Sequence, residues 1–419
     1  MRKQFYLFIL LFTSLQTFAQ APYDNNVYNS AIKSVEFYNT KKQGSFPVIV
    51  LGSDEKVQLA FDDLRGGSRN YYYTIEHCDT RWNSSNLSTA EYLTSFTDDR
   101  MYNYTYSTGT IQKYTHYDLQ LPSNNIAPKL SGNYILKVYE DGDQSKLVLT
   151  RRLYVLRKRV AIAADVVASQ NTQLRQTNQK VNFTIDYTGL QVQNPSTEVR
   201  TFIMQNARTA TGMLNMQPTY VRGSQLVYND IDLNDFPGRN EFRLFDTRTL
   251  KLNSQRVTRI VKDDTANNVV LLTDPVRDGQ GYLLLYDNNG KFFVLNQDGH
   301  DPRTDADYAH VYFSLAANKP EAEGSPYIVG QFNDYKLDER SRMSAGEGGK
   351  YYINLLLKQG VYDYEYVWVD SRTQKASDVL MEGSHFETEN DYQMLIYYRP
   401  PTARWDELVG FGELNTAKK

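Results

Sequence analysis

Short runs with apolar or aromatic side chains at every second position recur along this chain, and this pattern constrains the fold more than any other feature of the sequence. The clearest run covers residues 361–369, where one face carries Tyr362, Tyr364, Tyr366 and Trp368. A period of two is that of a β-strand, because successive side chains point to opposite faces of a sheet. No stretch shows a sustained 3.6-residue period. The pattern predicts an all-β protein of tandem immunoglobulin- or fibronectin-like β-sandwich domains.

The composition agrees with this fold class. Tyrosine is abundant, with 33 residues against 19 Phe and 3 Trp, and aromatic residues favour the pleated, half-buried surface of a sheet. The 419 residues suffice for two or three domains. Cys78 is the single cysteine, so no intramolecular disulfide can form and stability must come from packed cores. The net charge of −3 lacks the strong positive balance of a nucleic-acid-binding protein.

The first 19 residues have the features of a secretory signal peptide. Arg2 and Lys3 form a basic start, residues 5–15 are an apolar run, and Thr17 and Ala19 place small side chains before the expected cleavage site. The apolar run is shorter than the ~20 residues that a membrane-spanning helix needs. We therefore expect an exported chain with no membrane-spanning segment once the signal peptide is removed.

Turn signals divide the exported chain into three expected sandwich units. The first holds about seven short strands at roughly ten-residue spacing, which is typical of an immunoglobulin-like sandwich. The expected boundaries are residues 20–157 for the first sandwich, 158–303 for the second, 304–400 for the third and 401–419 for a C-terminal tail.

Two local patterns complete this division. Residues 282–286 and 292–295 are apolar runs separated by an Asn-Gly turn, which is a strong hairpin signal, and we expect this hairpin in the second sandwich. The apolar run at 394–398 precedes Pro400, and we expect it to be the strand that closes the sheet of the third sandwich.

Motifs that carry catalysis or bind metals are missing from the sequence. The five histidines do not pair at metal-ligand spacing, and there is no nucleophile elbow or phosphate-binding glycine loop. Adjacent carboxylates such as Asp62 and Asp63 point to opposite faces of a strand and cannot flank one bond. The aspartates of residues 296–307 could ligate calcium, but their spacing favours a solvated linker. We expect no catalytic, cofactor-binding or metal-binding residues, and no enzyme activity.

The third unit is similar to early-set sandwich modules that bind glycogen and starch. The resemblance rests on PYIVGQFNDY at 326–335 and QGVYDYEY at 359–366. In those modules an exposed tryptophan stacks on the sugar, and Tyr335 stands at that position here. The alternative function is therefore that of an exported carbohydrate-binding protein. Exposure of Tyr335 and Trp368 on one flat face would favour it, and their burial would count against it.

Nearly the whole exported chain resembles the plug protein family of the bacterial type IX secretion system. The stretches that carry the resemblance include FDDL at 61–64, NYYYT at 70–74, YTHY at 114–117, SGNYILKVY at 131–139, PTYVRG at 218–223, FNDY at 332–335 and DELVG at 406–410. The resemblance implies a non-enzymatic periplasmic β-protein. It would bind the periplasmic opening of the giant outer-membrane β-barrel translocon and close it while no cargo is engaged.

Sealing a wide pore requires a complementary surface rather than catalytic chemistry. A standard interface buries on the order of 1,600 Å² in total, and exposed Trp and Tyr side chains are its usual anchors. Trp82, Trp405 and Tyr335 are the candidate partner-binding residues. The alternative for each is an aromatic side chain packed within the protein itself.

Overall fold

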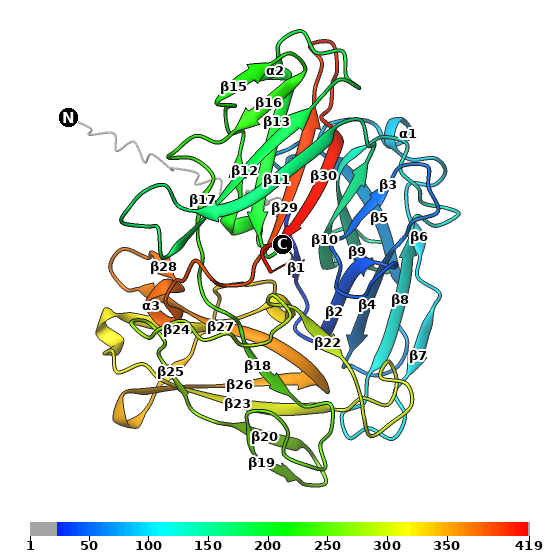
Figure 1. Ribbon diagram of the computed structural model, residues 1–419. Helices are drawn as coiled ribbons and strands as arrows, with labels where there is room; N and C mark the ends of the chain where they lie inside the picture. Colours follow the sequence, from blue (N-terminus) through cyan, green and yellow to red (C-terminus); the bar gives the residue numbers. More distant parts are fainter. Residues whose placement is uncertain (1–22, 418–419) are drawn as a thin grey trace, which may run out of the picture.

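The computed structural model describes residues 23–417, so the predicted signal peptide at residues 1–19 lies outside the described part. The described residues form six sheets that pack in pairs as three β-sandwiches, placed at the corners of a triangle (Figure 1). The all-β sandwich prediction is confirmed. Short helical turns punctuate the strands: α1 (Thr89–Tyr92), α2 (Pro195–Glu198), α3 (Val379–Glu382), η1 (Thr209–Thr211), η2 (Glu321–Glu323), η3 (Gln331–Asn333) and η4 (Glu347–Gly349). No helix among these residues is long and apolar enough to span a bilayer.

The first sandwich contains strands β1 to β10. One sheet has the order β1 (Asn26–Val27), β10 (Leu147–Leu156), β9 (Gly132–Glu140), β5 (Tyr71–Cys78) and β6 (Asp99–Arg100), with β3 (Val48–Val50) parallel to β10. The other has the order β2 (Ile32–Asn39), β4 (Val57–Asp63), β8 (Thr115–Leu121) and β7 (Tyr104–Tyr106). Tyr71, Tyr73 and Ile75 are buried in the core between the sheets, as the alternation predicts.

The second sandwich combines strands from two distant parts of the chain. One sheet has the order β11 (Ala161–Ala168), β12 (Asn178–Asp186), β16 (Gln225–Tyr228) and β15 (Tyr220–Arg222), with β17 (Asp235–Pro237) also on β12. The other has the order β14 (Met213–Leu214), β13 (Val199–Gln205), β29 (Asp391–Tyr398) and β30 (Glu407–Asn415). Figure 1 shows β29 and β30 in red among the green strands of this sandwich.

The expectation that residues 394–398 close the third sandwich is therefore wrong. β29 pairs with β13 along nearly its whole length, from Tyr398 opposite Val199 to Tyr392 opposite Gln205. All eight residues of β29 are buried. One face lies in the core of the second sandwich, and Leu395 and Tyr397 on the other face pack against the first sandwich. An apolar run with two buried faces carries no alternation that would identify its partner strand.

The third sandwich contains strands β18 to β28. One sheet is built on the long strand β27 (Gly360–Asp370), which pairs with β18 (Arg243–Asp246), β22 (Phe292–Val294), β24 (Gly324–Val329) and β28 (Ala376–Ser377). The other has the order β19 (Val257–Lys262), β20 (Asn267–Leu271), β23 (Tyr308–Ala316), β26 (Lys350–Lys358) and β25 (Ser344–Ala345), with β21 (Asp274–Pro275) on β23. Tyr362, Tyr364 and Tyr366 fill the core between them.

Strands β18 to β22 were expected in the second sandwich, but they pair within the third. The hairpin expected at 282–286 and 292–295 is also wrong, because β22 pairs with β27 and residues 282–286 form no strand. We propose a division in which the third sandwich, at residues 241–386, is inserted between β17 and β29 of the second. The tail expected at 401–419 contains β30, which pairs with β29.

Candidate functional site at the junction of the three sandwiches

A buried carboxylate joins the first sandwich to the third. Asp62 on β4 and His116 on β8 are cross-strand partners, and His116 Nδ1 lies 2.6 Å from Asp62 Oδ1. From the third sandwich, Lys358 Nζ lies 2.7 Å from Asp62 Oδ2 and the Tyr308 hydroxyl donates to the same oxygen at 2.7 Å. All four side chains are buried. Because buried charges need partners, the buried Asp62 carboxylate depends on donors from both sandwiches for its compensation.

The charge of His116 follows from these contacts. Burial alone lowers the pKa of this histidine, but the neighbouring carboxylates of Asp118 and Asp62 outweigh burial and raise the pKa to about 9. The imidazole is therefore protonated at neutral pH and adds a second cation beside Asp62. Asp63, the next residue, points the other way and accepts hydrogen bonds from Arg65 at 2.9 Å and Tyr71 at 2.8 Å, as the strand geometry predicts.

Hydrogen bonds to backbone amides and carbonyls also join the first sandwich to the third. Asp307 accepts hydrogen bonds from the amides of Ile111 at 2.7 Å and Gln112 at 3.1 Å, and the Thr108 amide donates to the Thr304 carbonyl at 2.9 Å. Asp305, within the same acidic segment, caps the amide of Asp301 at 2.8 Å. Within residues 23–417 no group of three or more His, Cys, Asp or Glu side chains could hold a metal ion.

An apolar cluster joins the first sandwich to the second. Its buried members are Phe46, Tyr154 and Leu156 from the first sandwich and Met204, Leu395, Tyr397 and Leu408 from the second. The Tyr397 hydroxyl donates to Asn133 Oδ1 across the interface at 2.8 Å. This cluster has the composition of a domain core rather than of a transient contact.

One of the predicted partner-binding residues, Trp82, packs against this same cluster. Trp82 packs edge-on against Tyr154 with ring centroids 5.3 Å apart, and the Arg152 guanidinium lies 4.3 Å over the Trp82 ring. Trp405 is half-buried, in the loop between β29 and β30. Its neighbour Asp406 accepts a hydrogen bond from the Thr80 amide at 3.1 Å, which fixes that loop on the first sandwich.

Tyr335, the third predicted residue, lies between the second and third sandwiches. Its hydroxyl donates to the Gly290 carbonyl at 3.1 Å, and the Arg208 guanidinium covers its ring at 4.4 Å. Arg208 also pairs with Glu365 at 2.6 Å. Trp368 is only 3% exposed. The Tyr335 ring is half-buried with Arg208 over it, and the Trp368 ring is buried, so the two do not form one exposed flat face, which counts against the carbohydrate-binding alternative.

A cavity of about 370 Å³ lies where the three sandwiches meet, and its walls come from all three. Charged side chains of both signs line it, and they pair across the sandwich boundaries. Arg151 of the first sandwich lies 3.2 Å from Asp334 of the third, and Lys336 of the third pairs with Asp24 of the first. The ion pairs that line the cavity therefore connect the first sandwich to the third.

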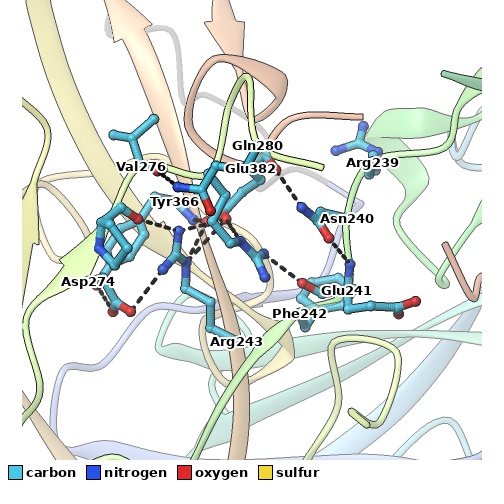
Figure 2. Close-up of polar contacts among 12 residues, drawn as sticks. Arg239, Asn240, Glu241, Phe242, Arg243, Asp274, Val276, Gln280, Tyr366 and Glu382 are labelled. Carbon is cyan, nitrogen blue, oxygen red and sulfur yellow. Dashed lines mark hydrogen bonds and ion pairs between the residues drawn. The ribbon is translucent and has the colours of Figure 1, made fainter. Parts of the chain in front are cut away.

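A buried polar cluster fixes the chain where it enters the third sandwich (Figure 2). Arg243 on β18 donates to Glu382 on α3 at 2.9 Å and to Asp274 on β21 at 2.8 Å. Arg277 adds a bond to Glu382 at 2.7 Å, and the Tyr366 hydroxyl adds one to Asp274 at 2.9 Å. Burial raises the pKa of Glu382, but Arg243 and Arg277 outweigh it and hold that pKa below its usual range.

Sequence reasoning identified none of these polar contacts as a site. Asp62 entered only as half of an adjacent carboxylate pair, and Arg243, Glu382 and Lys358 carried no motif. Their partners are distant in sequence; Lys358, for example, follows Asp62 by 296 positions. No local spacing rule connects such residues, so only the folded chain brings them together.

The comparisons with known proteins follow the division seen in the fold. Residues 32–157, the first sandwich, match the family model described as type 9 secretion system plug protein 1st domain. A crystal structure of a hypothetical protein from Parabacteroides merdae ATCC 43184 is 32% identical, with a TM-score of 0.90 over 94% of this chain and 100% of that one. No curated protein matches the chain. The chain belongs to the type 9 secretion system plug protein family.

Proposed function

We propose that the chain is a non-enzymatic periplasmic plug. It binds the periplasmic opening of the outer-membrane translocon barrel of the type IX secretion system and seals that opening while no cargo is engaged. The observation that carries this proposal is the match of the first sandwich to the plug domain family. A solved structure of a hypothetical protein shares the fold of nearly the whole chain.

The inter-sandwich contacts support this role. A protein that closes a wide aqueous pore must be rigid, because domains that move independently would open gaps between the protein and the pore wall. Here each pair of sandwiches is joined by buried groups: Asp62 with Lys358, Tyr397 with Asn133, and Arg208 with Glu365. Contacts of this kind make relative domain motion costly, in contrast to the small polar interfaces that permit it.

The positions of the predicted aromatic anchors narrow the search for the sealing surface. Trp82 and Tyr335 pack at sandwich boundaries, and Trp405 is half-buried in a loop whose Asp406 contacts the first sandwich. We infer that they serve the assembly of the three sandwiches, and that contact with the barrel uses other exposed groups.

The test is an affinity purification of the full-length chain, tagged at its C-terminus, from gently solubilised envelopes, with the co-purified proteins identified by mass spectrometry. We expect a very large outer-membrane barrel in near-equal amount. A second assay reconstitutes that barrel in a planar bilayer and measures ionic conductance before and after the purified chain is added to the periplasmic side, where we expect the conductance to fall. Recovery of no barrel, together with retention on immobilised α-glucan, would refute the proposal.

A further inference from the structure

In the loop between β21 and β22, four consecutive apolar side chains are exposed to solvent. The exposed fractions are 67% for Leu283, 56% for Leu284, 39% for Leu285 and 88% for Tyr286. A continuous exposed run of this kind differs from the singly scattered apolar residues of an ordinary surface, and such runs mark interaction sites.

The run is held in place at both ends. On one side, the Tyr282 hydroxyl donates to Glu241 at 2.5 Å and its ring lies 5.7 Å from that of His385. On the other side, the Asp287 carboxylate accepts hydrogen bonds from the amides of Phe242 and Asn289. The apolar side chains are therefore presented on a fixed segment.

The backbone amides and carbonyls of this segment are open to hydrogen bonding by a partner. Among the described residues, no hydrogen bond reaches the amides or carbonyls of residues 281–287. The sequence here has the pattern of a hairpin strand, but the other half of that hairpin, β22, pairs with β27 instead. A strand-forming segment is thus left without a strand partner inside the described chain.

The segment also lacks the residues that normally protect an open edge. Residues 279–286 contain no Lys, Arg, Asp, Glu or Pro. Natural proteins place such residues on exposed edges to prevent pairing with another chain. Their absence here, together with the free backbone, favours pairing with a strand from outside.

We propose that residues 282–286 dock an extended segment of the translocon that lies at its periplasmic side, outside the closed hydrogen-bond ladder of the barrel, by β-strand addition. The partner strand supplies hydrogen bonds to the free amides and carbonyls, and its apolar side chains cover Leu283 to Tyr286. This inference rests on the proposed plug function and names the contact through which the plug holds the barrel.

Two other occupants fit the observations less well. Insertion into lipid would place unpaired backbone groups in the hydrocarbon region, where each costs several kcal/mol. A second copy of the chain, paired at this segment alone, would bring together only four apolar side chains from each copy, whereas a stable interface takes about 20–30 residues a side. A large partner can add contacts beyond the segment, and the barrel is such a partner.

The test compares the full-length protein with Leu284→Asp, and with Leu252→Asp as the matched control. Leu252 is also a highly exposed leucine, at 73%, and lies in the loop between β18 and β19. Binding to the purified, detergent-solubilised barrel is measured by biolayer interferometry. Hydrogen–deuterium exchange of residues 281–287 is followed with and without the barrel, and thermal unfolding verifies that both variants fold.

We expect Leu284→Asp to weaken binding about tenfold or more, as for the loss of an interface hot spot, and Leu252→Asp to leave it within about twofold. We also expect the amides of 281–287 to become protected in the complex. Equal binding by Leu284→Asp and unchanged exchange would overturn the docking inference while leaving the plug function intact. Absence of binding by the wild type would overturn both.

The other occupants have their own outcomes. Binding of the wild type to phosphatidylethanolamine–phosphatidylglycerol vesicles that is lost in Leu284→Asp, without protection by the barrel, would overturn strand docking in favour of the membrane. A concentration-dependent dimer that Leu284→Asp abolishes, again without protection by the barrel, would overturn it in favour of a second copy.

Discussion

Replacing Asp62 with asparagine removes the carboxylate that donors from two sandwiches share. Lys358 then remains buried without a countercharge, and the protonated His116 keeps only Asp118, at 3.5 Å. Breaking a buried ion pair costs about 3–5 kcal/mol. We expect the lower end, about 3 kcal/mol, because the Lys358 ammonium keeps the Arg303 carbonyl at 3.3 Å and the face of the Tyr114 ring at 4.1 Å.

Asp63→Asn on the same strand is the matched control. Asp63 is equally buried, but its partner Arg65 is partly exposed and retains Glu140 at 2.6 Å, so we expect a cost of about 1–2 kcal/mol. Urea denaturation at pH 7 measures both variants. Hydrogen exchange at the Thr108 and Ile111 amides, which cross to the third sandwich, should accelerate in Asp62→Asn alone. An Asp62→Asn cost no larger than that of Asp63→Asn, with unchanged exchange, would refute the reasoning.

Three further predictions follow from buried groups. The pKa of His116 is raised to about 9 from 6.5, so the contribution of the protonated imidazole to stability is full below pH 6.5 and is lost as pH rises through 9. Urea titrations at a series of pH values should show the free energy of unfolding falling by up to about 3 kcal/mol across this window. His116→Gln should make the free energy of unfolding depend less on pH there. Arg243→Met leaves Glu382 and Asp274 buried without their shared cation, so we expect about 3 kcal/mol of destabilisation and earlier tryptic cleavage within residues 241–386; a cleavage pattern like that of the wild type would contradict this. Burial raises the pKa of the Cys78 thiol and leaves it inaccessible, so iodoacetamide should label it only in denaturant, and labelling of the native protein would show that β5 opens.

The local patterns of the sequence predicted individual strands well. The alternation at Tyr71, Tyr73 and Ile75, and at Tyr362, Tyr364 and Tyr366, placed these side chains in cores, where they lie. Such patterns are reliable because neighbouring residues on a strand must face opposite ways, whatever the rest of the chain does.

The same reasoning failed wherever the partner of a strand had to be chosen. β29 and β22 are both apolar strands. Neither the alternation of side chains nor the residues of the adjoining turns indicates which of several strands each one pairs with. For Trp82, Trp405 and Tyr335, which are aromatic residues in loops, the sequence does not distinguish a loop that contacts another sandwich from one that contacts another protein.

The sequence by itself thus determined the all-β class, the faces of many strands and the family to which the chain belongs. The tertiary structure alone decided that β29 pairs with β13 of the second sandwich, that Asp62 meets Lys358, 296 positions further along the chain, and that residues 281–287 have no strand partner among the described residues. The physical reason is the range of the interactions. Side-chain direction follows from the local backbone, whereas strand pairing and buried ion pairs depend on which distant segments the packed cores bring into contact.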